Sequence, residues 1–147
     1  MGRTPERRTI LQGGRPKAYR PLARDAIAHA LEEGLAAYRD GEFFEAHELL
    51  EPAWMGTDDL PERELYQGLI KLAAAFVHRG RGNAAGVEKN LVGARRRLLA
   101  ARAGGASTPG VELDHVLAAL DDTLAALGRG VPLARIEPIA LSANADD

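Results

Sequence analysis

The side chains best suited to chemistry lie in one short segment, residues 41–54. His47 and Glu51 are four residues apart, so on a helix they lie one turn apart on the same side. Both could reach one divalent metal ion, with His78 from a later helix as a third ligand. An open fourth position would hold a water of lowered pKa, and Glu48 could act as its base. The spacing therefore suggests a metal-assisted hydrolytic site.

Aromatic and polar side chains surround this candidate site. On a helix, Phe44 and Trp54 lie beside the His–Glu pair, and Gln67 points the same way as His78, three turns along the next helix. Such residues would orient a ligand or a water, or would line a groove. The residues that we expect in these positions are Gln67, Trp54, Phe44 and Asn83.

The same side chains also suit two roles without catalysis. In the first, His47 donates to Glu51 or to a carbonyl group, and Gln67 and His78 tie the third helix to the second. A satisfied buried network of this kind fixes one packing arrangement and need bind nothing. In the second, His47, Trp54 and His78 line the groove of an interaction module, which binds a peptide or forms a homodimer. Sequence alone leaves the three alternatives open.

Length and composition limit the choice of function. The chain of 147 residues suits one domain with a single core. It has no Cys, so a metal would need His and carboxylate ligands. The most apolar run, residues 69–77, contains Lys71 and is too short to span a membrane, and the N-terminus has no apolar segment typical of a signal peptide. We therefore expect a cytoplasmic protein that binds a small molecule or another protein.

Hydrophobic spacing predicts five helices and no strand. Apolar residues recur at intervals of three and four, and Gly or Pro residues separate the runs. The helices are expected over residues 21–40, 42–54, 61–79, 84–103 and 111–127. The second should kink or loosen at Pro52, which has no N–H to donate. We predict an all-α fold, a compact bundle of about five helices joined as antiparallel hairpins.

The two ends of the chain differ from the bundle of residues 21–128. Residues 1–20 contain six basic residues and one acidic residue, with Gly13-Gly14 breaking any helical periodicity, so we expect a basic flexible arm. Residues 129–147 contain two Pro among apolar residues, which predicts an extended tail over the bundle or over a partner subunit.

A second basic run lies within the fourth predicted helix, at Arg95-Arg96-Arg97. Such a run is typical of a solvated face, and acidic residues on the next helix could balance it. This run and the N-terminal arm are not obviously one surface, and the net charge of the chain is −2. We therefore do not expect nucleic acid as a partner.

Several blocks of this sequence resemble one known family. They occur in the family's order over about residues 25–100 and comprise residues 38–51 with Trp54, residues 67–73, His78 and residues 82–86. In these blocks the chain resembles the Domain of Unknown Function 309 family of small bacterial and archaeal proteins. The resemblance implies an all-helical protein labelled a metal-dependent hydrolase, without an established reaction. Pro52 stands where family members often have an acidic residue, whereas His47, Glu48 and Glu51 are in place.

Overall fold

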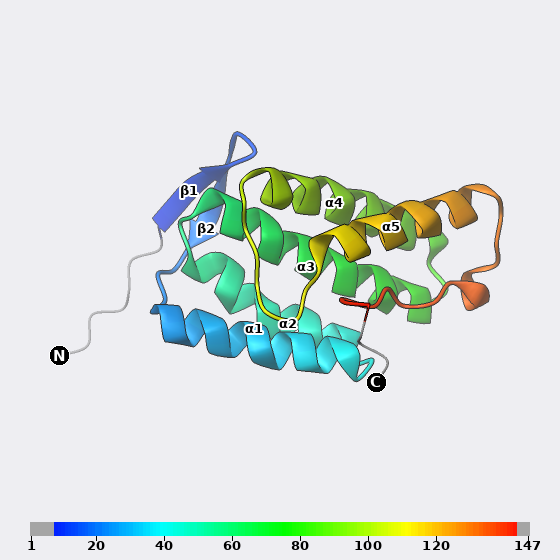
Figure 1. Cartoon of the computed structure of the whole chain (residues 1–147), viewed down its shortest axis with the longest axis horizontal. Coiled ribbons are helices and arrows are strands. Elements are labelled where there is room, and N and C mark those ends of the chain that lie inside the picture. The colour runs from blue at the N-terminus through cyan, green and yellow to red at the C-terminus, as the bar shows by residue number, and fades with distance from the viewer. Residues whose placement is uncertain (1–7, 144–147) are drawn as a thin grey trace.

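The computed structural model describes residues 8–143 and contains five α-helices and one β-hairpin in that range. The elements are β1 (Arg8–Gln12), β2 (Arg15–Tyr19), α1 (Arg24–Arg39), α2 (Phe43–Gly56), α3 (Leu60–Gly80), α4 (Ala84–Ala103), α5 (Leu113–Gly128) and a 3₁₀ turn, η1 (Leu133–Arg135). Helices adjacent in sequence pack in pairs, with α3 between α2 and α4 (Figure 1). The predicted bundle of five helices is confirmed.

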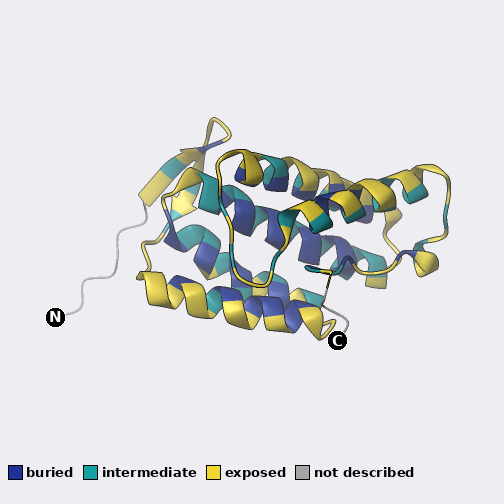
Figure 2. Ribbon diagram, viewed as in Figure 1, coloured by how far each residue is buried: buried dark blue, intermediate teal, exposed yellow. Residues whose placement is uncertain are grey.

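Helix α3 lies at the centre because apolar residues cover most of its circumference. Its buried apolar side chains are Leu65, Tyr66, Leu69, Ile70, Leu72, Ala73, Ala75 and Phe76. Helices α2 and α4 pack directly against α3, while α1 packs on α2 and α5 on α4; the inward faces of the helices are buried and their outward faces are exposed (Figure 2). Close contact between α3 and α4 requires Gly68, since a Cβ atom there would lie 2.6 Å from Leu98 Cδ2. No helix in the described range has the length and apolar content needed to cross a membrane.

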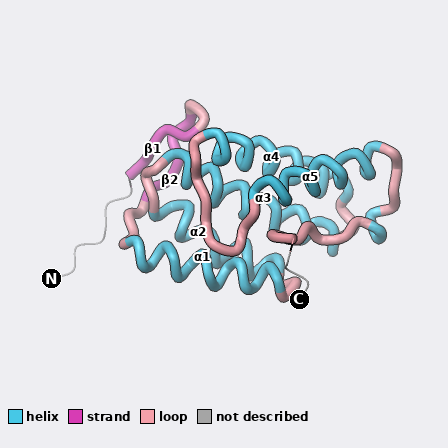
Figure 3. The backbone as a smooth tube through the Cα atoms, viewed as in Figure 1, coloured by secondary structure: helices cyan, strands magenta, loops and turns pink. Residues whose placement is uncertain are grey.

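The largest difference from the sequence-based expectation is the N-terminal hairpin. Strands β1 and β2 pair antiparallel, with Gln12 opposite Arg15 (Figure 3). Gly13 and Gly14 have φ values of 59° and 76°, the positive values that a two-residue type I′ turn requires. The expectation of no strand is therefore wrong for residues 8–19, where we expected a flexible arm. Residues 1–7, with Arg3 and Arg7, lie outside the described residues.

Helix α2 continues two residues beyond the predicted end at Trp54. Pro52 lies inside the helix, which ends at Gly56. The last carbonyl groups of a helix have no partner within it. Here the segment between β2 and α1 supplies donors, because Arg20 N donates to Met55 O at 2.7 Å and Leu22 N donates to Gly56 O at 3.0 Å.

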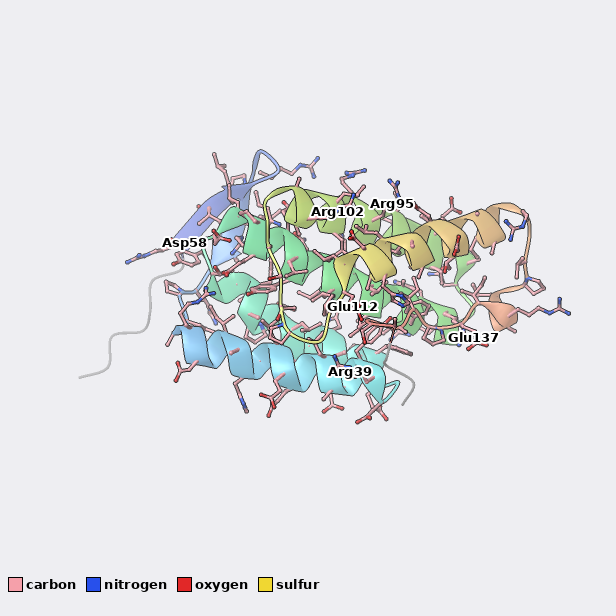
Figure 4. All side chains as sticks on the ribbon, in the orientation of Figure 1. Arg39, Asp58, Arg95, Arg102, Glu112 and Glu137 are labelled. Carbon is pink, nitrogen blue, oxygen red and sulfur yellow. The ribbon has the colours of Figure 1, made fainter. Side chains whose placement is uncertain are left out.

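The C-terminal segment lies over the bundle, which is the first of its two predicted placements. Ile136, Ile139 and Leu141 are buried there. The Tyr38 hydroxyl donates to Ile139 O at 2.6 Å, and burial raises the pKa of this phenol well above its usual value. Glu112, at the start of α5, donates its backbone N–H to Leu141 O at 2.8 Å (Figure 4). Residues 144–147 lie outside the described residues.

Candidate functional site

The predicted metal ligands do not meet in one place. Between residues 8 and 143, no group of three or more His, Asp and Glu side chains is placed to hold a metal ion. His47 Nδ1 lies 3.9 Å from Glu48 Oε1, and the ion pairs of this range include none between His47 and Glu51. His78 instead lies beside Asn83, with 3.1 Å between His78 Nδ1 and Asn83 Nδ2. The set of His47, Glu51 and His78 is therefore not assembled.

Two of the three acidic side chains of α2 face a surface pocket of about 370 Å³. Glu48 and Glu51 line it together with Pro52 and the segment before α1, but His47 does not. The side chain of His47 is 33% exposed, yet its Nδ1 atom is buried and has no hydrogen-bond partner in the described chain. Phe44 is 60% exposed at the start of α2. Asn83 caps α4, because its side chain accepts from Gly86 N at 3.1 Å.

Gln67 and Trp54 do come together, around a residue that the sequence-based prediction missed. The side chain of Gln12, at the end of β1, is 1% exposed. Its Nε2 atom donates to Gln67 Oε1 at 2.9 Å and to Glu64 Oε1 at 3.2 Å. Its Oε1 atom accepts from Trp54 Nε1 at 3.0 Å and from Arg63 Nε at 3.3 Å. An amide side chain has two N–H donors and two acceptor positions, so the hydrogen-bonding capacity of Gln12 is complete.

Arg63, near the start of α3, is fully buried and has no carboxylate partner in the described chain. Its guanidinium donates to Trp54 O at 2.8 Å, to Thr57 O at 3.0 Å and to Ala18 O at 2.9 Å. It also lies over the Trp54 ring, 4.8 Å from the ring centre, which favours a cation. Burial lowers the pKa of Arg63. The negative end of α2 and these carbonyl groups compensate this buried charge.

Glu64 connects this cluster to α4. Both of its carboxylate oxygens accept from Arg97 Nη1 on α4, at 3.1 and 3.2 Å. We call Gln12, Trp54, Arg63, Glu64, Gln67 and Arg97 the hairpin network, because their hydrogen bonds attach β1 and β2 to α2, α3 and α4. A two-stranded hairpin is marginally stable alone, so these bonds explain why it forms here.

Two signals in the sequence could have identified this network. Arg63 is one turn before Gln67, so it extends backwards the polar row of Gln67, Lys71 and His78 on α3. The pair Gly13-Gly14 between two short runs is a recognised hairpin turn, and it places Gln12 directly before the turn.

A cleft of about 490 Å³ lies between α1 and the loop that joins α4 to α5, and three of its four charged side chains, Arg24, Arg39 and Glu62, are engaged within the protein. Arg24 donates to both carboxylate oxygens of Glu62, at 2.8 and 2.7 Å, and these bonds lower the pKa of Glu62. Arg39 donates to Gly110 O at 3.0 Å (Figure 4). The fourth charged side chain is Glu32, and the other polar side chains of the lining are Tyr66, Ser107 and Thr108.

Comparison with known families agrees with the sequence resemblance. The range 31–90 matches the family model described as Domain of unknown function (DUF309). Residues 31–90 form a DUF309 domain. No curated protein and no solved structure matches the chain. The DUF309 domain contains Trp54, Arg63 and Gln67, whereas Gln12 and Arg97 lie outside the matched range. The hairpin network thus joins the family's domain to the segments that flank it.

Proposed function

We propose that the protein is a non-catalytic binding module built on its DUF309 domain. In this proposal the hairpin network maintains the fold, and the partner contacts the surface of the bundle. The observation that carries the proposal is the amide of Gln12, which uses all of its donors and acceptors within the protein. The Gln12 amide therefore has no hydrogen-bonding capacity left for a substrate or a metal-bound water.

The separation of the predicted ligands supports the same proposal. Glu48 and Glu51 face one pocket, while His78 is engaged by the cap of α4. A catalytic metal site needs three protein ligands around one point, with a position open for water. The partner of the module, whether a small molecule, a protein or a second copy of this chain, would then be recognised by exposed groups.

A metal-dependent hydrolase is the second candidate, and one observation favours it. His47 Nδ1 is buried without a hydrogen-bond partner among the described residues, and Glu48 lies 3.9 Å away. In this alternative, His47, Glu51 and His78 hold a divalent ion after rearrangement, and Glu48 acts as the base that activates water. The rearrangement would have to bring together side chains from α2 and from the far end of α3.

Metal analysis of freshly purified protein separates the two candidates. We expect less than about 0.1 mole of divalent metal per mole of chain. Calorimetric titration with Zn²⁺ or Mn²⁺ should show no binding of one ion per chain. His47→Ala and the matched control His29→Ala should behave alike, since His29 is an exposed residue on α1 paired with Glu33. One tightly bound ion per chain that is lost in His47→Ala, but kept in His29→Ala, would overturn the binding-module proposal.

A further inference from the structure

A groove of about 600 Å³ lies beside α3 and α4, and its lining has an excess of positive charge. Its basic lining residues are Arg15, Lys71, Lys89, Arg96 and Arg97, and Glu88 is the one acidic residue in its lining. We call this feature the basic groove. It lies between the start of β2, one turn of α3 and the outward face of α4. A local ratio of five cations to one carboxylate contrasts with the net charge of −2 for the whole chain.

Most of these cations have no partner in the described chain. Of the five, Arg97 alone is ion-paired between residues 8 and 143, with Glu64 at 3.1 Å. Burial lowers the pKa of Lys71, and the charges of Arg97, Lys17, Lys89 and Arg96 lower it further. Repulsion and desolvation therefore oppose folding at this place. Unfavourable electrostatics of this kind concentrate where a protein binds a ligand of opposite charge.

The fold builds the groove from two regions that are far apart in sequence. The hairpin network holds the turn of the hairpin against α4, so that a Cβ atom on Gly13 would lie 3.5 Å from Arg97 Nη1. Lys71 reaches across α4 at Gly93, where a Cβ atom would lie 2.9 Å from Lys71 Cδ. Arg15 of the hairpin thus lines one groove together with Arg96 and Arg97 of the basic run, which the sequence did not indicate.

The neighbours of Arg96 on α4 are engaged differently. Arg95 donates to Asp121 at 2.6 Å and Arg102 donates to Asp114 at 2.8 Å, both on α5 (Figure 4). The predicted balance between this basic run and the next helix is thus confirmed for Arg95. Helix α4 therefore has one face whose arginines are neutralised by α5 and another face, toward the basic groove, where Lys89 and Arg96 have no partner in the described chain.

The chemistry of the lining selects the class of ligand. Helix α4 contributes three cations to the groove, Lys89, Arg96 and Arg97, which extend over about 12 Å at the usual rise of a helix, so the cations form a row and not a single cradle. No aromatic side chain lines it, which removes the stacking that single strands require. No Asn or Gln lines it, so it lacks the amide side chains that recognise adenine. A row of cations without aromatic side chains suits the regular phosphates of a duplex.

We propose that the basic groove binds the phosphodiester backbone of double-stranded nucleic acid without reading its sequence. This inference rests on the proposed binding module and names its partner. Binding through phosphates alone gives a Kd of about 10⁻⁴ to 10⁻⁶ M at physiological salt. Four unpaired cations predict that log K falls with log salt at a slope of about −3.6. Affinity should then decrease about 50-fold between about 50 and 150 mM salt.

Fluorescence anisotropy with labelled duplexes of about 20 base pairs tests the proposal, using the full chain. The test variant is Lys89→Gln/Arg96→Gln, and the matched control is Arg95→Gln/Arg102→Gln, which removes the same charge from the same helix. We expect the test variant to lose about tenfold or more in affinity at low salt and to reduce the salt slope by about two. The control should lose less than about threefold. Circular dichroism and thermal unfolding should find both variants folded.

The probes distinguish the proposed ligand from its competitors. DNA and RNA duplexes of the same sequence both present the phosphodiester backbone, so binding of either one supports the proposal. Equal losses in the two variants, binding of single strands only, or no duplex binding at low salt would overturn it. Binding of inorganic tripolyphosphate without duplex binding would overturn it in favour of a small-anion site. Each of these failures leaves the metal analysis unchanged, so it is distinguishable from failure of the binding module itself.

Discussion

The hairpin network and the basic groove are adjacent polar clusters with opposite properties. In the network, the amide of Gln12 and the guanidinium of Arg63 are buried and hydrogen-bonded to protein groups. In the groove, Lys71 and Arg96 face other cations and have no acidic partner within residues 8–143. Arg97 belongs to both clusters, because it bonds Glu64 on one side and lines the groove on the other.

This difference separates groups that maintain the fold from groups that remain available to a ligand. Leaving one buried polar group without a partner costs about 1–3 kcal/mol, whereas an exposed ion pair contributes about 0–1 kcal/mol. Substitutions in the network should therefore change stability strongly. Substitutions in the groove should change binding and leave stability nearly constant or slightly higher.

The largest effect is expected for Arg63→Met, which keeps much of the side-chain volume but removes all the donors. The carbonyl groups of Ala18, Trp54 and Thr57 and the amide oxygen of Gln12 would each lose a buried hydrogen bond. We expect the free energy of unfolding in urea to fall by about 3–5 kcal/mol. The amide groups of β1 and β2 should lose protection from hydrogen exchange before those of α3 do.

The matched control for this variant is Arg102→Met. Arg102 makes one ion pair, with the exposed Asp114, so its loss should lower the free energy of unfolding by less than about 0.5 kcal/mol. Similar values for the two variants would contradict the assignment of the network as the structural cluster.

A smaller and more informative effect is expected for Glu64→Gln, at the boundary between the clusters. This change removes the acceptor charge that holds Arg97, so stability should fall by about 1–2 kcal/mol. It also frees Arg97 toward the groove, so duplex affinity at low salt should rise and the salt slope should become more negative by about one. Weaker duplex binding in this variant would show that the Glu64–Arg97 ion pair does not reduce the affinity of the basic groove for a duplex.

The smallest effect is expected for an ion pair outside both clusters, between Arg24 and Glu62. Arg24 lowers the pKa of Glu62 below its usual 4.5, so the folded protein binds a proton less readily than the unfolded chain. This contribution to stability is therefore present above about pH 4.5 and is lost as the pH falls through the lowered pKa. The difference in melting temperature between wild type and Arg24→Gln should be small at pH 7 and should shrink below pH 4.5. A melting-temperature difference that grows below pH 4.5 would contradict the expected direction of this pH dependence.

The helices were predictable from sequence because their signals are local. Helix α4 has the predicted bounds, residues 84–103, since Asn83 caps its first turn and Gly104 follows its last. Helix α2 is longer than predicted because its final carbonyl groups find donors in the segment before α1, which the local sequence does not reveal.

The polar residues were harder to assign, because their partners are distant in the chain. Gln67 and Trp54 were each expected beside the candidate site, but the residue that joins them, Gln12, lies more than 40 positions before Trp54. Arg63 was missed because a fully buried arginine without a carboxylate is uncommon. The basic groove was missed because its two halves meet only through the hairpin. The set of His47, Glu51 and His78 was predicted as metal ligands from helical spacing. Spacing within α2 places His47 near Glu51, but it does not fix the position of His78 on α3.

The variant Lys71→Met tests the division between the two clusters most directly, when its stability and its duplex affinity are measured on the same preparation. We expect the free energy of unfolding to stay constant or to rise by about 0.5 kcal/mol, because a cation repelled by its neighbours is removed. We expect duplex affinity at low salt to fall by at least about threefold in the same variant. A loss of more than about 1 kcal/mol in stability with unchanged affinity would show that Lys71 maintains the fold and does not bind the duplex.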